Sequence, residues 1–417
     1  MKRIHRPRRS FLFLQGPPGP FFWQLGRKIA AHGVSVHRIN LNGGDVYDWP
    51  GEATDYRGLP GHWPIFLDRF LRENAITDLV LYGDCRPMHL AAHRLAKLRG
   101  VAIHVFEEGY IRPDWMTLEP DGVNGHSTLN RDPEALLARA RTLPPLPNLP
   151  PITASFGRRA RDSYWYYHRV VTGRLRFPFY TSHRKTIIVI EGFGWMRKFL
   201  LSRRRTVQAG ETLALLKDKP FYLFALQLNG DYQIREHSPF GTMYTAADYV
   251  LDSFAHNAPP GTHLLVKEHP LDCSFHNWRR FLRHRARALG IEDRVHHLDG
   301  GDLVALAEQA KGMVCVNSTS GTLALAAGRP VIVLGDAIYD VPGITHQGHL
   351  DAFWDAPAAP DMALFDAFRR VLHQHCLIRG GLASESATET LIETSFERLM
   401  GREKREIPDF ETVSIIA

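Results

Sequence analysis

At residues 263–270 the chain reads His-Leu-Leu-Val-Lys-Glu-His-Pro, an apolar run that ends in charged and polar residues. The apolar part predicts a buried parallel strand. Pro270 ends this strand, because proline has no amide hydrogen to donate to a sheet. His269 is thereby placed at the carboxyl end of a strand, where open α/β sheets bind their ligands. An isolated histidine at a strand end more often only bonds to a loop carbonyl. The residues at the other strand ends must therefore show whether His269 belongs to a ligand site.

Length and composition set the first bounds. The chain has 417 residues, of which 44% are hydrophobic and 23% charged, which fits a soluble globular protein of two domains. No run of about 18 uncharged apolar residues occurs, so we expect no membrane-spanning helix. The basic start is followed by too short an apolar run for a signal peptide. The net charge of +7 suits an anionic partner, namely a nucleotide, a phospholipid surface or a nucleic acid.

The cysteines are few and scattered. Cys85, Cys273, Cys315 and Cys376 show no paired spacing, which argues against a disulfide framework and a zinc site and favours a reducing cytoplasm. No other cluster of metal ligands is evident in the sequence, and we expect neither a metal nor a cofactor.

Strand and helix patterns alternate along both halves of the chain, which predicts parallel sheets covered by helices. Expected strands lie at 11–14, 34–41, 78–82 and 101–106, and then at 186–190, 221–227, 263–266, 295–298, 312–316 and 331–334. The Pro-rich run at 143–151 predicts a stiff linker. We expect an α/β protein with two Rossmann-like domains facing a cleft: an acceptor-side domain at 1–150, a basic aromatic segment at 151–205, a donor-binding domain at 206–380, and a C-terminal helix and tail at 381–417.

Acidic residues follow an apolar strand at Glu107-Glu108-Gly109. Neighbouring strand residues point to opposite faces, so only one carboxylate easily enters a cleft. Such a glutamate is a candidate general base or nucleophile, and Gly109 permits close approach of the backbone. A solvated acidic loop is the alternative. Asp231, in a loop after the strand at 221–227, is a second candidate catalytic carboxylate, although an ordinary turn aspartate is the common case.

Hydroxyl side chains and a glycine precede an expected helix at Asn317-Ser318-Thr319-Ser320-Gly321. Backbone N–H groups and hydroxyls at a helix N-terminus make a phosphate site. An ordinary N-cap needs only one such residue, so this sequence exceeds the requirement of a cap. The Gly/Pro-rich loop at 15–20 is not a nucleotide-binding motif; Gly16 either shapes an acceptor pocket or belongs to a structural turn.

Arginines interleave with aromatic residues between residues 158 and 184. This pattern is typical of a membrane–water interface, and single-stranded nucleic acid could use the same ingredients. An interdomain helix with core aromatics has about equal weight. We disfavour nucleic acid because acidic strand ends would repel its phosphates.

Together these motifs resemble those of glycosyltransferases with the GT-B fold that use CMP-activated acidic sugars. The closer similarity is to the KpsS/LipB family of capsule polysaccharide biosynthesis and export proteins. It is carried by segments between residue 11 and about residue 335, including Leu-Gln-Gly-Pro at 14–17, Tyr-Gly-Asp-Cys-Arg-Pro at 82–87, Glu-Glu-Gly-Tyr-Ile-Arg-Pro at 107–113, and Gln227 with Asp-Tyr-Gln-Ile at 231–234.

The resemblance implies a β-Kdo transferase that uses CMP-Kdo and retains configuration. Its acceptor would be lysophosphatidylglycerol at the cytoplasmic face of the inner membrane, where other capsule proteins would be partners. It implies that Asp231 is the nucleophile and Glu108 the acid/base, and that His269 stabilises the departing phosphate. The expected donor site is Lys267, His269, Pro270, Asn317, Ser318, Thr319, Ser320 and Gly321. The expected acceptor or sugar site is Gly16, Asp84, Arg86, Glu107, Gly109, Arg112, Gln227 and Gln233.

A non-catalytic export or assembly adaptor on the same scaffold is the alternative function. The acidic residues, His269 and the hydroxyl cluster, all retained in one chain, count against it.

Overall fold

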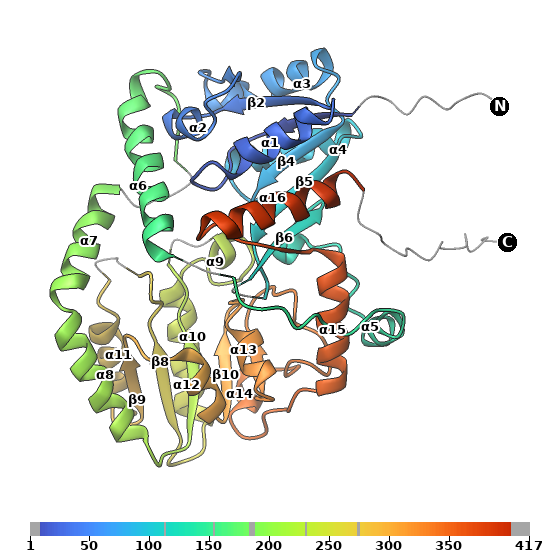
Figure 1. The fold of residues 1–417 in the computed structure, drawn as a ribbon. Coiled ribbons are helices and arrows are strands. Elements are labelled where there is room, and N and C mark those ends of the chain that lie inside the picture. The colour runs from blue at the N-terminus through green and yellow to red at the C-terminus, as the bar shows by residue number, and fades with distance from the viewer. Residues whose placement is uncertain are drawn as a thin grey trace.

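The computed structural model describes residues 9–111, 114–152, 155–182, 188–229, 232–272 and 276–401. Within these residues the chain forms two α/β lobes, each built on its own sheet. The lobes lie one above the other in Figure 1, with the N-terminal lobe at the top. This arrangement of two Rossmann-like units confirms the expected GT-B architecture.

The sheet of the N-terminal lobe has seven strands in the described part of the chain. Their order is β12-β6-β5-β4-β1-β2-β3, with bounds Leu377–Arg379, Trp115–Pro120, Ala102–Glu108, Asp78–Tyr82, Ser10–Phe13, Ser35–Asn40 and Thr54–Asp55. The strands from β5 to β3 are parallel, whereas β6 and β12 pair antiparallel at one edge. The sequence did not predict this antiparallel edge.

Both faces of this sheet are covered, which explains why residues 11–13 of β1 are all apolar. Phe11 and Phe13 pack with α1 and α16, whereas Leu12 packs with α3 and α4 on the other face, as the alternation of strand side chains requires. The helices of this lobe are α1 Phe21–Ala31, α2 Gly43–Asp48, α3 Trp63–Glu73, α4 Pro87–Leu98 and α16 Glu385–Leu399, with short 3-10 turns at Pro60–His62 and Asn124–His126. The helix α5 Pro133–Ala140 packs instead on α15 of the C-terminal lobe (Figure 1).

The sheet of the C-terminal lobe is parallel over its five described strands. Their order is β11-β10-β7-β8-β9, with bounds Val331–Val333, Gly312–Cys315, Phe221–Ala225, His263–Lys267 and Val295–Leu298. Its helices are α9 Tyr232–Glu236, α10 Met243–Asn257, α11 Trp278–Ala288, α12 Leu303–Gln309, α13 Gly321–Ala326, α14 Leu350–Phe353 and α15 Met362–His375.

Three helices and a 3-10 turn connect the lobes along one side of the molecule. They are α6 Phe156–Thr172, η3 Gly173–Leu175, α7 Ile188–Leu200 and α8 Ser202–Leu216. The strand expected at 186–190 is wrong from residue 188 onward, because α7 begins there; residues 186 and 187 lie outside the described residues. A short apolar run does not distinguish a strand from a buried helix. The Pro-rich run at 143–151 does lack helix and strand, as expected.

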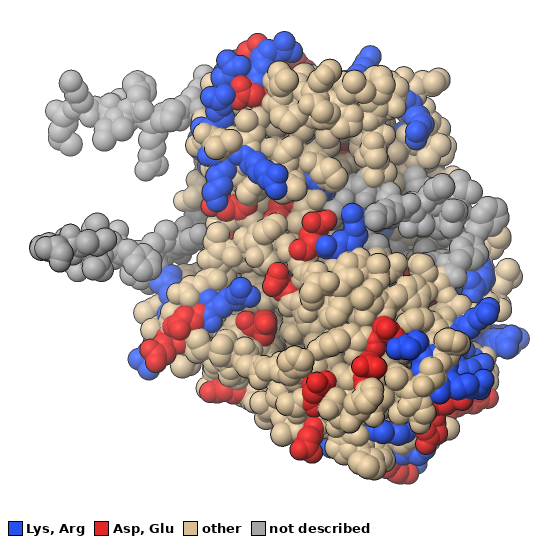
Figure 2. Space-filling model, turned by 180° about the vertical axis from the view of Figure 1, so that it is seen from behind, with Lys and Arg blue, Asp and Glu red and all other residues tan. Residues whose placement is uncertain are grey.

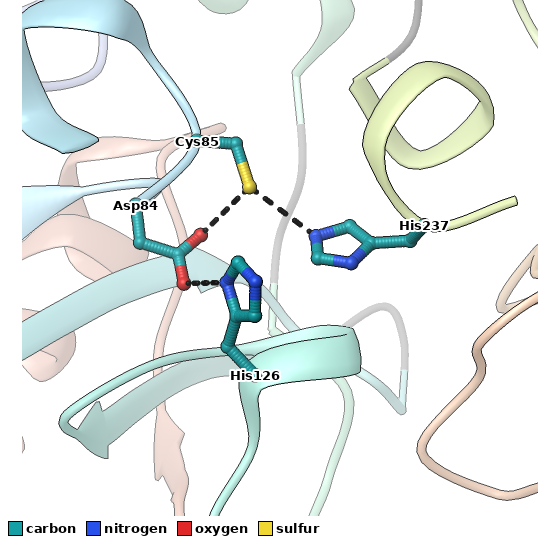
Figure 3. Close-up of side chains that lie close together, drawn as sticks. All are labelled: Asp84, Cys85, His126 and His237. Atoms are coloured by element: carbon teal, nitrogen blue, oxygen red, sulfur yellow. Dashed lines mark hydrogen bonds and ion pairs between the residues drawn. The ribbon is translucent and has the colours of Figure 1, made fainter. Parts of the chain in front are cut away.

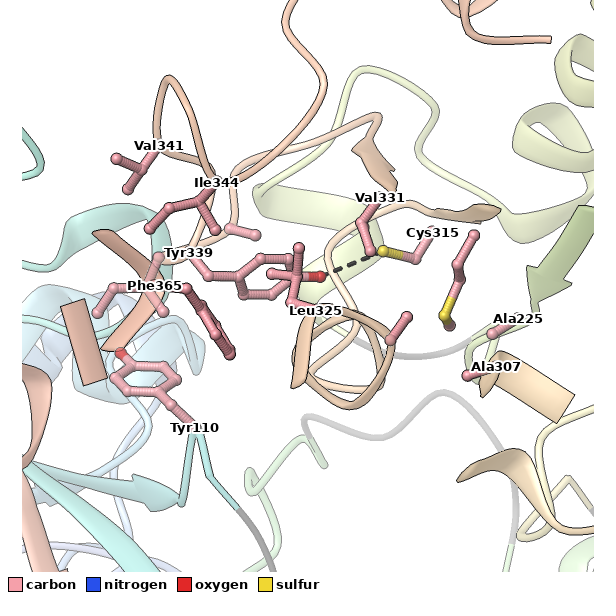
Figure 4. Packing of buried hydrophobic residues seen from close by; sticks show 14 of the residues in the cluster. Tyr110, Ala225, Ala307, Cys315, Leu325, Val331, Tyr339, Val341, Ile344 and Phe365 are labelled. Atoms are coloured by element: carbon pink, nitrogen blue, oxygen red, sulfur yellow. Dashed lines mark hydrogen bonds between the residues drawn. The ribbon is translucent and has the colours of Figure 1, made fainter. Parts of the chain in front are cut away.

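The chain returns to the N-terminal lobe near its end. β12 joins the first sheet and α16 packs on α1, so the crossing precedes the boundary that the sequence suggested at residue 380. The two cores also meet: Tyr110, from the first lobe, lies in one buried cluster with Tyr339 and Phe365 of the second lobe (Figure 4). Among the described residues, no helix is both long and apolar enough to cross a bilayer.

Candidate functional site

The predicted donor residues share one edge of the second sheet. His269 follows β8 and Ser318 follows β10, and β7 lies between these two strands. Adjacent strands are about 4.8 Å apart, so the two strand ends are separated by about 10 Å. A separation of this size leaves room for a nucleoside monophosphate between the two strand ends.

His269 is held by a turn of its own backbone. The N–H of Leu271 donates to His269 Nδ1 at 3.1 Å, and the N–H of Asp272 donates to the His269 carbonyl at 2.9 Å. Since Nδ1 accepts a hydrogen bond, the neutral ring carries its proton on Nε2. Lys198 of α7 donates to the carbonyls of Pro270 at 2.7 Å and Asp272 at 3.0 Å. The His-Pro turn is therefore fixed from both sides.

The hydroxyl cluster forms a compact turn before α13. Ser320 donates through its hydroxyl to Ser318 Oγ at 2.7 Å and through its N–H at 3.2 Å, while Thr322 Oγ1 donates to the Thr319 carbonyl at 2.7 Å. α13 has only six residues, so its dipole adds less than a longer helix would. A Cβ at Gly321 would overlap the Tyr339 hydroxyl, which explains the glycine.

Lys267 is the last residue of β8, and it is buried. Burial lowers the pKa of its ammonium group, and the carboxylate of Asp299 opposes that shift. The neighbouring Glu268 accepts from His297 Nε2 at 3.0 Å. The end of β8 therefore carries two buried charged side chains, Lys267 near Asp299 and Glu268 bonded to His297.

Glu108 is held across the lobe by partners distant in sequence. Its Oε1 accepts from Arg159 Nη2 of α6 at 2.8 Å and from the Tyr82 hydroxyl at 3.3 Å. Burial, reinforced by the nearby glutamates, raises the pKa of Tyr82 well above its usual value, so this phenol remains a donor. Glu107 is turned toward its own backbone, where its Oε1 accepts from the Glu108 N–H at 2.9 Å.

Glycine is required after this pair. A Cβ at Gly109 would overlap the carbonyl of Trp115, which confirms the close backbone approach expected there. Arg86 lies over the Tyr82 ring at 5.4 Å and donates to the Gly16 carbonyl at 3.4 Å. Arg86 and Gly16 are therefore neighbours, and both lie near Glu108 through Tyr82.

A chain of polar contacts connects the strand ends of the two lobes. Gln227 Nε2 donates to Asn317 Oδ1 at 2.9 Å, and the Asn317 N–H donates back to Gln227 Oε1 at 3.1 Å. Asn317 Nδ2 donates to the His237 carbonyl at 3.0 Å, and the His237 ring reaches Cys85 Sγ at 3.2 Å. Cys85 follows β4 of the first sheet, so the carboxyl ends of both sheets face the same space.

Some predicted residues lie outside the described residues. Asp231 and Arg112 are among them, and so is the side chain of Gln233 in α9. Their roles stay predictions from sequence.

The structure also places residues at this edge that the sequence reasoning missed. A small hollow of about 10 Å³ is lined by Gly16, Pro17, Gly19, Phe22, Arg38, Asp45, Asp48 and Trp49. Burial raises the pKa of Asp48 to about 8, although the N–H of Gly19 donates to its carboxylate at 2.8 Å. The sequence signal that could have identified Asp45 and Asp48 was their position shortly after strand β2. In the structure both residues lie within the short helix α2.

Four potential metal ligands were also missed. Asp84, Cys85, His126 and His237 have ligand atoms within 4.8 Å of one another. Asp84 was expected to bind sugar, but its carboxylate accepts from His126 Nδ1 at 2.9 Å and from Cys85 Sγ at 3.3 Å. No regular spacing marks these residues in the sequence, because they come from separate segments.

The basic aromatic segment divides into a buried and an exposed part. Tyr166 is buried and its hydroxyl accepts from Gln15 Nε2 at 2.6 Å, whereas Tyr164 and Trp165 are exposed. Exposed apolar residues continue onto α7 at Phe199 (84% exposed) and Leu200 (78% exposed). Figure 2 shows Lys and Arg gathering on the side of the C-terminal lobe where α8 and α11 lie, with some acidic residues among them.

Comparisons with known proteins agree with the predicted family. The family described as "Capsule polysaccharide biosynthesis protein" matches residues 77–382. The chain is 34% identical over 370 residues to the capsule polysaccharide export protein KpsS of Escherichia coli, covering 87% of this chain and 94% of that protein. It is 33% identical over 369 residues to the capsule polysaccharide modification protein LipB of Neisseria meningitidis serogroup A, covering 86% and 88%.

Among solved structures, the chain is similar to Thermosulfurimonas dismutans KpsC, a beta Kdo 2,7 transferase. The sequences are 16% identical, 95% of this chain and 100% of that chain are covered, and the TM-score is 0.44. The family match and the two bacterial relatives show that this chain belongs to the capsule polysaccharide biosynthesis protein family.

Proposed function

We propose that this protein is a glycosyltransferase that moves β-Kdo from CMP-Kdo to a lysophosphatidylglycerol acceptor and thereby starts the poly-Kdo linker of a capsular polysaccharide. The observation that carries the proposal is the pairing of two different strand-end sets across one space. The second lobe offers hydrogen-bond donors at His269 and Ser318–Ser320, and the first offers a held carboxylate at Glu108.

The donor set suits the departing nucleotide. When the bond between the anomeric carbon and the phosphate breaks, negative charge grows on a phosphate oxygen. The His269 Nε2–H and the hydroxyls near Ser318 can donate to that oxygen, and preorganised donors are a large source of catalysis. CMP is a good leaving group, so the proposal uses no cofactor.

The acid set suits a retaining reaction through two displacements. Asp231, assigned from its motif alone, attacks the anomeric carbon as CMP leaves. Glu108 then takes the proton of the acceptor hydroxyl, whose oxygen displaces Asp231 from the same carbon. Arg86 and Arg112 are proposed to pair with the Kdo carboxylate or the acceptor phosphate.

The decisive experiment incubates the purified full chain with CMP-Kdo and short-chain lysophosphatidylglycerol and reads the product by mass spectrometry. Addition of Kdo to the lipid is expected. Binding of CMP by calorimetry without any transfer would favour the non-catalytic adaptor, and absence of both would refute the donor site as well.

We also propose that α6 and α7 dock the protein on the cytoplasmic face of the inner membrane. The support is the exposed apolar surface at Phe199 and Leu200, next to exposed basic residues such as Arg203 and Arg204. Apolar groups that enter the headgroup region, together with cations that meet anionic lipid, give such binding. Lys198 of the same helix contacts the His-Pro turn, so docking would bring the donor site close to the lipid.

Sedimentation with phosphatidylglycerol vesicles tests this surface. The double variant Phe199→Ser, Leu200→Ser should bind vesicles more weakly than the unaltered protein. Leu98→Ser is the matched control, because Leu98 is also 84% exposed but lies on α4 of the other lobe. Equal loss in both variants would count against docking through α7.

A further inference from the structure

Four side chains with different ligand atoms converge where the two lobes meet (Figure 3). Asp84 and Cys85 follow β4, His126 ends a 3-10 turn of the first lobe, and His237 follows α9 of the second lobe. Cys85 Sγ lies 3.3 Å from Asp84 Oδ1 and 3.2 Å from His237 Nε2, while His126 Nδ1 lies 2.9 Å from Asp84 Oδ2. We propose that these four residues bind a divalent transition-metal ion, with Zn²⁺ the best fit, and that this ion fastens the lobes together.

The donor set selects the class of metal. It contains one thiol sulfur, two imidazole nitrogens and one carboxylate, which is a mixture that zinc accepts and that calcium and magnesium do not favour. Zinc bonds are about 2.0–2.3 Å long, so ligand atoms of a tetrahedral site are about 3.3–3.8 Å apart. The two separations of 3.2 and 3.3 Å from Cys85 are close to that range. The four ligand atoms lie within 4.8 Å of one another, so the most distant pair would have to approach by up to about 1 Å.

The backbone around the cluster is already arranged. The carbonyl of His237 accepts from the Asn317 side chain at 3.0 Å and from the Asp336 N–H at 2.8 Å, which fixes the residue that comes from the second lobe. Asp84 Oδ2 also accepts from the Val123 N–H at 3.3 Å. Support of this kind orients metal ligands and strengthens binding.

Space for the histidines depends on a glycine. A Cβ at Gly125 would lie 2.5 Å from His237 Nδ1, so a larger residue would push the ring away. The His126 side chain is 51% exposed, whereas that of Asp84 is 5% exposed. An ion can therefore enter from the His126 side and meet the buried carboxylate.

Metal binding would release one proton. Zn²⁺ takes the thiolate of Cys85, the thiol proton goes to solvent, and the neutral histidines and the Asp84 carboxylate complete the coordination. Three ligands belong to the first lobe and one to the second, so the ion would hold the cleft at one width. This inference is independent of the proposed transferase activity and assigns Asp84 to the metal instead of the sugar.

The test adds Co²⁺ and, separately, Zn²⁺ to the full chain after chelator treatment. A thiolate-to-Co²⁺ absorption band at one equivalent, with competition by Zn²⁺ and a higher unfolding temperature with Zn²⁺, is expected. Cys85→Ser should abolish the band, and His237→Gln should weaken Zn²⁺ binding by at least about 10-fold. His256→Ala, at an exposed position on α10, should leave both unchanged.

Absence of the thiolate band in the unaltered protein would overturn the site without reference to any variant. Zn²⁺ affinity that is equal in the unaltered protein and in His237→Gln would also overturn it, because the ion would then be bound by histidines elsewhere. Circular dichroism of each variant separates loss of a ligand from loss of the fold.

Discussion

The strand ends of the two lobes are held in different ways. In the C-terminal lobe, His269 is fixed by the N–H of Leu271 and Ser318 by Ser320, partners no more than two residues away. In the N-terminal lobe, Glu108 depends on Arg159, 51 residues later, and Asp84 on His126, 42 residues later. Near neighbours therefore hold the His269 ring and the Ser318 hydroxyl, whereas tertiary packing holds the Glu108 and Asp84 carboxylates. The backbone of the two donor turns is also fixed from a distance, by Lys198 and by Tyr339.

This difference has a consequence for substitutions. Substitutions in α6 should displace the Glu108 carboxylate without altering strand β5, because the Arg159 that holds this carboxylate comes from a distant part of the sequence. The donor side should respond to changes in its own turns and in the residues that fix them, such as Lys198, but not to changes at Arg159.

Asp231→Asn should lower transfer from CMP-Kdo by at least about 10⁴-fold, as expected when a nucleophile is removed. It should also prevent a covalent Kdo adduct, which intact mass spectrometry after incubation with donor would detect in the unaltered protein. Asp218→Asn, at an exposed position, is the control. An adduct that persists in Asp231→Asn would assign the nucleophile to another carboxylate.

His269→Ala should reduce kcat by about 10²–10³-fold, equivalent to about 2.7–4 kcal/mol, because one preorganised donor to the phosphate is lost. The acidic side should remain intact, since no described contact joins His269 to Glu108. Steady-state kinetics of this variant, compared with His256→Ala, gives the measurement. Near-normal kcat would remove His269 from the donor site.

Arg159→Gln should reduce kcat on the order of 10-fold, because Glu108 loses the guanidinium that orients it; a displacement of about 1 Å can cost 10²-fold. Arg161→Gln is the matched control on the same helix, where the Arg161 side chain is 63% exposed. Affinity for CMP should stay constant in both variants. If Arg159→Gln weakened CMP binding as strongly as catalysis, the separation of the two sides would be wrong.

Asp48→Asn should change how the free energy of unfolding depends on pH, and it should leave catalysis unchanged. The pKa of Asp48 is raised to about 8 by burial, so between about pH 4 and pH 8 the folded chain keeps a proton that the unfolded chain releases. The free energy of unfolding therefore falls as pH rises through this window, by up to about 1.4 kcal/mol per pH unit for one group.

Urea unfolding at several pH values would measure this dependence. Asp48→Asn should flatten it and Asp218→Asn should not. An unchanged slope in Asp48→Asn would show that Asp48 titrates normally in the folded protein.

The predictable part of the site is its locally built part. The His-Pro turn after β8 and the hydroxyl turn after β10 were placed at strand ends from composition and breakers alone, and Gly109 was recognised as a close approach. The strand expected at 186–190 was wrong from residue 188, because a threonine followed by four apolar residues carries no period that separates a strand from a helix. Pairing of β6 with β12, more than 250 residues apart, left no local signal.

By itself, the sequence determined the two α/β halves, the parallel strands and the residues that follow each of them, because alternation, apolar runs and turn residues act over a few neighbours. Only the tertiary structure decided which lobe α16 covers, which cation holds Glu108, and that His237 meets Cys85 across the lobes. Those contacts join segments whose separation along the chain carries no pattern, and packing of the finished sheets selects them.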